Sequence, residues 1–164
     1  MLKVLPNRPR IIGGKRAFAL VVSQYNAVYV QGLVDHAANE ILALMPAANL
    51  VLHQVPGAFE IPIVVQEIAN RKDGRVVDVI LALGVIIQGD TDHASHLGRT
   101  VTDALMSIAL RSRIPVIHEV LSVKDDAQAR VRCLEDKYNR GTEAARTAIA
   151  ISQLMAELKA AAEP

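Results

Sequence analysis

The sequence predicts an α/β domain in which a four-stranded parallel sheet is covered by helices on both faces, and three observations favour this class. Four short runs of continuous apolar residues occur, which is typical of strands buried on both faces of a parallel sheet. Between them lie segments whose apolar residues recur at three- and four-residue spacing, as in amphipathic helices. The chain has 164 residues, of which 51% are hydrophobic, so it is long enough for one domain with a sizeable core.

The first half of the chain is predicted to contain two strands and two helices. AFALVV at 17–22 is the first strand, and the helix that follows begins after Asn26, a plausible N-cap, and ends at Pro46. LVLHQV at 50–55 is the second strand. Proline and glycine in PGAFEIP, at 56–62, indicate a loop, and IVVQEIANR continues as the second helix.

The second half repeats this alternation. VVDVILAL at 76–83 is the third strand and leads into the loop GVIIQGDTD. Apolar residues at helical spacing then predict a helix, and they are Leu97, Val101, Ala104, Leu105 and Ile108. PVIHEVL at 115–121 is the fourth strand, followed by a short helix at 125–134. A break at 139–141 precedes an alanine-rich final helix that ends near Lys159.

Helices between parallel strands act as crossover connections, so the predicted fold is a flavodoxin-like three-layer sandwich. Ligands bind such sheets beyond the carboxyl ends of the strands, and the distinctive residues of this chain cluster there. Residues 15–164 are predicted to form this single domain. Residues 1–14, which include Pro6 and Pro9, are expected to be an extended amino-terminal arm.

Composition excludes several classes of function. Lys and Arg number 18 against 17 Asp and Glu, and this balance argues against a nucleic acid or an anionic membrane held mainly by charge. The single cysteine, Cys133, allows neither an internal disulfide nor a thiolate zinc cage, so we expect a packed, inert thiol and a reducing, cytoplasmic location. The chain shows no signal peptide, and no run approaches the roughly 20 apolar residues of a membrane helix.

The segment LGVIIQGDTDHASHL carries most of the candidate chemistry. A strand end followed by Asp90, Thr91 and a helix start exposes unpaired backbone amides, which together with the helix dipole favour an anion such as phosphate. The alternative is that Thr91 or Asp92 only caps the helix. His93 lies in the first helical turn, where the dipole favours the neutral imidazole that a proton acceptor needs.

Other candidates have structural alternatives that the residues alone leave open. His93 and His96 lie on nearly the same helical face and, with a nearby aspartate, are a possible metal set, although no HExxH spacing occurs. Tyr25 either stacks on a planar ring or packs across the sheet edge. Glu60 binds hydroxyls, acts as a base, or only interacts with a helix dipole. Arg132 either clamps phosphate or lies on a solvated helix face.

Three motifs, PGAFEIP, LGVIIQGDTDH and QARVRCLEDKYNRGTEAA, occur in this order at the predicted strand ends and together resemble lumazine synthase. The similarity runs from about Lys15 to Leu158. The resemblance implies a transferase of riboflavin biosynthesis that condenses 5-amino-6-(D-ribitylamino)uracil with 3,4-dihydroxy-2-butanone 4-phosphate. It implies no metal and no redox cofactor. It also implies homopentamers or multiples of pentamers, with active sites between neighbouring subunits.

The resemblance also assigns roles to residues of this chain. His93 matches the catalytic histidine. Asp90 and Thr91 match the residues whose backbone amides hold the butanone phosphate, and Arg132 matches the arginine that reaches it from the adjacent subunit. The residues that match the pyrimidine and ribityl site are Tyr25, Ala58, Phe59, Glu60, Val85, Ile86, Ile87 and, from the second subunit, His118.

Four places depart from the family pattern. Gln88 replaces a common arginine, residues 94–96 replace a motif with two aromatics, His118 replaces an aromatic, and Arg140 replaces a lysine. The substitutions at Gln88 and His118 leave open a non-catalytic flavin-binding or shell-forming homologue. An archaeal-type riboflavin synthase, from the same superfamily, is a further alternative. The number of subunits in the assembly does not follow from the residues.

Overall fold

The computed structural model describes residues 8, 10, 14–71 and 76–162, and most of the predicted arm at 1–14 lies outside these ranges. Its centre is a four-stranded, fully parallel sheet in the order β2-β1-β3-β4. The strands are β1 (Ala17–Ser23), β2 (Asn49–Val55), β3 (Val79–Ile87) and β4 (Val116–Val123). The predicted parallel sheet is therefore confirmed.

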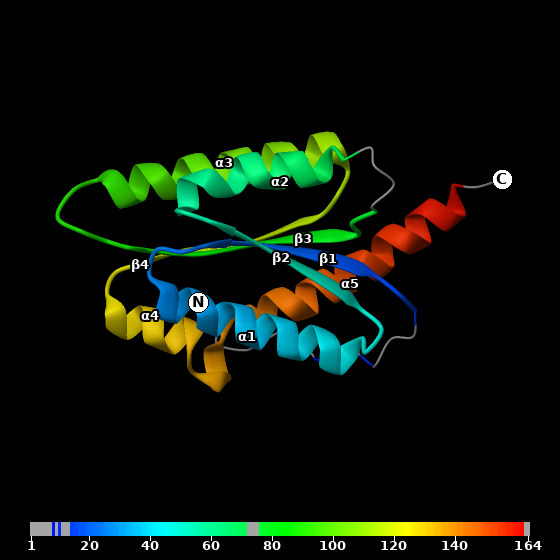
Figure 1. Ribbon diagram of the computed structural model, residues 1–164, viewed down its shortest axis with the longest axis horizontal. Coiled ribbons are helices and arrows are strands. Elements are labelled where there is room, and N and C mark those ends of the chain that lie inside the picture. The colour runs from blue at the N-terminus through cyan, green and yellow to red at the C-terminus, as the bar shows by residue number, and fades with distance from the viewer. Residues whose placement is uncertain (1–7, 9, 11–13, 72–75, 163–164) are drawn as a thin grey trace.

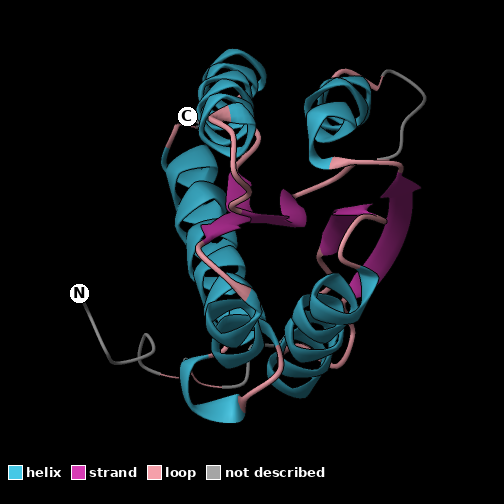
Figure 2. Ribbon diagram, turned by 90° about the vertical axis from the view of Figure 1, so that its left-hand side faces the viewer, coloured by secondary structure: helices cyan, strands magenta, loops and turns pink. Residues whose placement is uncertain are grey.

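Helices cover both faces of the sheet and make the three layers of the predicted flavodoxin-like sandwich (Figure 1). One face carries α1 (Ala27–Leu44), α4 (Asp126–Cys133) and α5 (Arg140–Ala161), and the other carries α2 (Ile61–Ala69) and α3 (His93–Ser112). Figure 2 views the molecule from the carboxyl ends of the strands and shows the sheet between these two layers. Each face has its own apolar core, because strand residues alternate between the two sides.

The third strand begins and ends later than the sequence predicts. The apolar run predicts a strand at 76–83 and a loop over the next four residues, whereas β3 spans Val79–Ile87. The extension pairs in register with β4, from Gly84 opposite Val120 to Ile87 opposite Val123. Pairing with a strand more than thirty residues away satisfies these backbone groups, and a local pattern cannot reveal it.

Two small residues let the helices on one face pack closely. A Cβ atom added to Gly141 would lie 2.3 Å from the backbone oxygen of Leu33, and one added to Gly32 would lie 2.4 Å from that of Cys133. Contacts this short do not occur for real Cβ atoms. Helices α1 and α5 therefore approach at a distance that only glycine permits at position 141.

The predicted break at 139–141 is a helix cap. Asn139 is fully buried, and its side-chain oxygen accepts hydrogen bonds from the N–H groups of Gly141 at 2.8 Å and Thr142 at 3.4 Å. Its side-chain nitrogen donates to the Cys133 carbonyl at 2.8 Å, which ties the end of α4 to the start of α5. Asparagine is a favoured N-cap, so α5 begins at Arg140 without a gap in backbone pairing.

No described helix is long and apolar enough to span a lipid bilayer.

Candidate functional site

A cavity of about 410 Å³ opens beyond the carboxyl ends of β1, β2 and β3. The residues that line it are Tyr25, Asn26, Gly57, Ala58, Phe59, Glu60, Val85, Ile86, Ile87, His93 and Leu97. Eight of them are predicted site residues, brought together from four separate parts of the chain. This is where a parallel α/β sheet binds its ligand.

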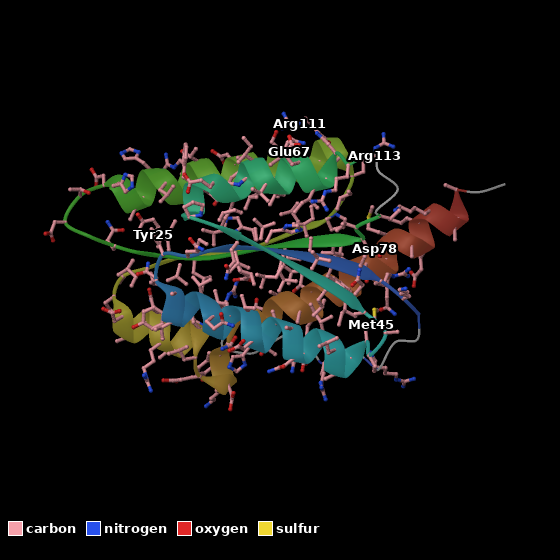
Figure 3. The ribbon with its side chains drawn as sticks, viewed as in Figure 1. Tyr25, Met45, Glu67, Asp78, Arg111 and Arg113 are labelled. Carbon is pink, nitrogen blue, oxygen red and sulfur yellow. The ribbon has the colours of Figure 1, made fainter. Side chains whose placement is uncertain are left out.

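Two exposed aromatic side chains stand at this cavity. Tyr25 is 72% exposed and Phe59 is 63% exposed, although both are large apolar residues. The Tyr25 ring lies against Gly57, where an added Cβ would be 3.2 Å from the ring carbon Cδ2. Figure 3 shows Tyr25 at the end of the sheet where α1 begins. The Tyr25 ring therefore packs in part against the loop after β2, and both aromatic rings remain accessible to a planar ligand.

The floor of the cavity is apolar and comes from the end of β3. Val85 and Ile86 are buried, and Ile87 is half-buried. Asn26 fixes the neighbouring loop, because its side-chain nitrogen donates to the Val85 carbonyl at 2.8 Å. Asn26 stands at the N-cap position of α1 but does not cap it, since its backbone is left-handed, with φ at 58°. The prediction that its side chain caps the helix is therefore wrong.

Glu60 is held by the loop that presents it. Its Oε2 atom accepts a hydrogen bond from the Gly57 N–H at 2.9 Å and closes the short 3₁₀ turn Ala58–Glu60. Within the described part of the chain, no hydrogen bond engages its second carboxylate oxygen. Glu60 thus combines a structural contact with a free acceptor at the cavity.

The turn before α3 has the features of an anion site. Residues 88–93 are exposed, and Asp92 occupies the N-cap position without a side-chain hydrogen bond to the helix. The alternative that Asp92 caps the helix is therefore wrong. A weak hydrogen bond of 3.5 Å from the Gln88 side chain to the Thr91 carbonyl closes the turn. The first amides of a 20-residue helix thus remain available, with the positive end of its dipole behind them.

His93 joins this turn to the cavity. It is the first residue of α3 and lines the cavity, whereas Asp90 and Thr91 lie in the turn just before it. Leu97, one helical turn later on the same face, also lines the cavity. An imidazole is therefore placed between the cavity and the row of unpaired amides.

Two predicted site residues, Arg132 and His118, lie neither at the cavity nor in the turn before α3. Arg132 lies on α4, which packs on the face of the sheet opposite to α2 and α3. His118 lies in the middle of β4 and is half-buried toward α3. The cavity of a single chain is thus missing both groups that the resemblance assigns to a neighbouring subunit.

Hydrogen bonds define the tautomer of His118. Its Nδ1 accepts from the Val120 N–H at 3.2 Å, so the ring proton is on Nε2, which lies 2.7 Å from the Thr102 hydroxyl oxygen. The Thr102 hydroxyl donates in turn to the Gly98 carbonyl at 2.7 Å. Burial lowers the pKa of His118, and although an interaction with its own backbone raises the pKa in part, the charge of Arg140 adds to the lowering. The residue is therefore a neutral link between β4 and α3.

Arg140 forms a buried ion-pair network on the opposite face of β4. Its guanidinium donates to both carboxylate oxygens of Glu119, at 2.9 and 3.0 Å, and to Glu143 at 2.6 Å. Glu119 is only 4% exposed, and burial raises its pKa to about 7 even with Arg140 beside it. The arginine that replaces the family lysine is thus engaged inside its own subunit.

The described residues bear on two expectations from the sequence, the metal set at His93 and His96 and the packed thiol of Cys133. No group of three or more His, Cys, Asp or Glu side chains among them is placed to hold a metal ion, so His93 and His96 do not form the proposed metal set. Cys133 is fully buried, and burial raises its pKa to about 12. The prediction that the thiol is packed is confirmed, and the raised pKa agrees with low reactivity.

Three cavity residues were not predicted as site residues, and each had a sequence signal. Asn26 directly follows Tyr25, and Gly57 belongs to the PGAFEIP loop. Leu97 is four residues after His93 and so shares its helical face.

Fold and site together define a flavodoxin-like α/β domain with an aromatic-lined pocket and an uncapped helix start at the carboxyl edge of its sheet. Residues 15–156 match the sequence profile of 6,7-dimethyl-8-ribityllumazine synthase. A protein of that name from Halorhodospira halophila (strain DSM 244 / SL1) is 37% identical over 144 residues, which cover 87% of this chain and 90% of the relative. The chain belongs to the 6,7-dimethyl-8-ribityllumazine synthase family.

Proposed function

We propose that this protein is a transferase of riboflavin biosynthesis, which condenses 5-amino-6-(D-ribitylamino)uracil with 3,4-dihydroxy-2-butanone 4-phosphate. The products are 6,7-dimethyl-8-ribityllumazine, phosphate and water. Family membership supports the reaction. The observation that carries the site assignment is the single cavity that joins the aromatic pair, the apolar floor and His93.

The cavity suits the pyrimidine substrate. A planar ring can stack on Tyr25 above the floor formed by Val85, Ile86 and Ile87. The ribityl chain carries hydroxyl donors, and the free carboxylate oxygen of Glu60 can accept one of them. Phe59 lines the same cavity and offers a second, exposed aromatic ring.

The turn before α3 suits the phosphate of the second substrate. That phosphate carries close to two negative charges at neutral pH, and the amides at Asp90 and Thr91 precede an uncapped helix start. In our proposal Arg132 of a neighbouring subunit completes the receptor with a charge-assisted hydrogen bond. The ketone carbon, which is two carbons away from the carbon that carries this phosphate, can then lie near His93.

His93 is proposed to move protons between the reacting groups. An amine of the pyrimidine attacks the ketone to give a carbinolamine, which loses water to form an imine. Phosphate elimination and ring closure follow. Each step needs a proton added or removed, and one imidazole can serve several of them. Orientation of the two substrates supplies most of the remaining acceleration.

We also propose that the active unit is a homo-oligomer, a pentamer or a multiple of pentamers, in the cytoplasm. The absence of Arg132 and His118 from the cavity of their own chain supports a site completed by a neighbour. Met106 and Leu110 of α3 are 61% and 72% exposed, and Leu110 lines an apolar groove of about 350 Å³ beside β4. Native mass spectrometry tests this, and a monomer with full activity would contradict it.

One assay tests the reaction itself. Purified protein is mixed with both substrates in metal-free buffer, and the lumazine chromophore and released phosphate are followed together. We expect one phosphate for each lumazine formed. Assembled protein that produces neither would overturn the proposal, and formation of riboflavin from lumazine alone would favour the archaeal-type synthase.

Replacing Arg132 with alanine is expected to raise the KM for the butanone phosphate about 10- to 100-fold, because a hydrogen bond to a charged group contributes about 1.5–3 kcal/mol. The KM for the pyrimidine should stay within about twofold of its value in the unaltered protein, because Arg132 is not assigned to that substrate. Steady-state kinetics with each substrate varied in turn measures both constants. Arg130→Ala, on the same helix, is the matched control and should change neither. A selective loss of pyrimidine affinity in Arg132→Ala would refute the phosphate assignment.

Replacing Tyr25 with alanine is expected to weaken pyrimidine binding about tenfold, because stacking of a base on an aromatic side chain contributes about 1–3 kcal/mol. Tyr25→Phe keeps the ring and should bind almost as well as the unaltered protein. Isothermal titration with the pyrimidine substrate measures both variants. Equal affinities for the alanine and phenylalanine variants would show that the ring does not stack on Tyr25.

A further inference from the structure

A second cavity, of about 270 Å³, lies at the amino edge of the sheet, opposite the pocket that holds Tyr25. Its polar lining comes from Arg16 before β1, Asp78 before β3, Arg113 after α3 and Lys159 near the end of α5. Figure 3 shows Asp78 and Arg113 at the end of the molecule away from Tyr25. No part of the proposed reaction uses this cavity.

The cavity has a surplus of positive charge. Three cationic side chains line it against one carboxylate, which gives a side-chain charge of 3 − 1 = +2. None of the three cations makes an ion pair with a described residue. One carboxylate oxygen of Asp78 is already engaged, since Oδ2 accepts a hydrogen bond from the Ala17 N–H at 2.8 Å. The carboxyl ends of α3 and α5 lower the surplus, at about half an elementary charge each, but leave it positive.

Arg16 has a buried hydrogen-bond donor that lacks an acceptor among the described residues. Its Nε atom is buried, and no described residue accepts a hydrogen bond from it. A buried donor without an acceptor is unfavourable, and a partly desolvated guanidinium without an anion is more so. An anion in the cavity would lie beside this guanidinium and offset its desolvation.

Arg113 is held in an unusual backbone conformation at the same cavity. Its φ is 59°, in the left-handed region, at the position after a helix where glycine is usual. The backbone N–H still bonds to the Ala109 carbonyl at 2.9 Å, so the strained geometry closes α3. Strained backbone positions are found at ligand clamps, and Arg113 lines the cavity from such a position.

We propose that this cavity is a second anion-binding site, for a phosphate ion or the phosphoryl group of a small phosphate ester. Two guanidinium groups and one ammonium group match the charge and the acceptors of a phosphate. The volume holds a phosphoryl group and a few further atoms and excludes a large nucleotide. The site is separate from the phosphate turn before α3, and it does not rest on the proposed reaction.

Equilibrium dialysis with radiolabelled inorganic phosphate tests the site. We expect Arg113→Gly to bind about one phosphate fewer per subunit than the unaltered protein, and Arg16→Gln to do the same. Glycine adopts the left-handed conformation readily, so the loss in Arg113→Gly cannot be ascribed to misfolding. Arg111→Gln is the matched control, because Arg111 lies on the same helix outside the cavity and bonds to Gln66. It should retain full binding.

Three further measurements locate the site and its ligand. Arg132→Ala should still bind phosphate at the second cavity, where Arg113→Gly does not. Arg113→Gly should form lumazine at the rate of the unaltered protein. A tungstate-soaked crystal should show an anomalous peak against Arg16 and Arg113. Displacement of labelled phosphate by glycerol 3-phosphate at lower concentration than by phosphate would identify an ester ligand, and the reverse order would identify the free ion. Unchanged binding in Arg113→Gly and Arg16→Gln, or a peak only at the turn before α3, would overturn the proposal.

Discussion

Replacing His93 with alanine is expected to lower kcat for lumazine formation about 10- to 100-fold without abolishing it, near the lower end of the range for general acid and base catalysis. The imidazole lines the cavity at the start of α3, where we propose that it exchanges protons with the reacting amine and ketone. The two bound substrates keep their relative orientation in the variant, and water can carry protons more slowly. Single-turnover rates at saturating substrate measure the chemical step alone.

His96→Ala is the matched control for this prediction. His96 lies three residues further along α3, is exposed, and does not line the cavity. Its replacement should leave kcat within about twofold, as for a surface substitution away from the site. An unchanged rate in His93→Ala, or an equal loss in His96→Ala, would remove His93 from the mechanism.

Replacing Gly141 with alanine is expected to destabilise the fold by about 3 kcal/mol, the upper end of the range for overpacking. The added Cβ would meet the Leu33 backbone oxygen at 2.3 Å and the Asn139 side-chain oxygen at 3.0 Å. A backbone oxygen cannot rotate away as a side chain can, so α1 and α5 must separate. Urea unfolding at a fixed protein concentration measures the change, because assembly also affects apparent stability.

Gly98→Ala provides the comparison. Gly98 lies inside α3, and the nearest atom to an added Cβ is Cβ of Ser122, at 3.9 Å. Alanine at this position should be neutral or should stabilise by about 0.5–1 kcal/mol, because glycine is the weaker helix former. Equal stability of Gly141→Ala and the unaltered protein would show that the two helices are not in the close contact described.

Much of the site follows from the sequence because of a general property of parallel sheets. The carboxyl ends of the strands meet at one edge, so segments that follow different strands must meet there. Tyr25 follows β1, Phe59 and Glu60 follow β2, and His93 follows β3, and all four line one cavity. Strand order is not needed for that expectation, because continuous apolar runs are sufficient to predict the strands.

Other features depended on pairings that no local pattern contains. The end of β3 was placed too early, because its last residues are held by β4 rather than by their neighbours. Asn26 was expected to cap a helix, but its side chain bonds to the carbonyl of Val85, 59 positions away. The sequence shows Arg140 only as a departure from the family pattern, because its ion-pair partner Glu119 is 21 positions away.

Residue type and spacing along the chain are enough to predict the α/β class, the alternation of strands and helices, and the motifs that carry the family resemblance. Contacts between distant segments set the tautomer of His118, the network of Arg140, the distance of Arg132 from the cavity of its own chain, and the cluster of Arg16, Arg113 and Lys159 at the amino edge of the sheet. These features arise where distant segments come into contact. Hydrogen bonding and charge act between atoms a few ångströms apart in space, whatever their separation in the sequence.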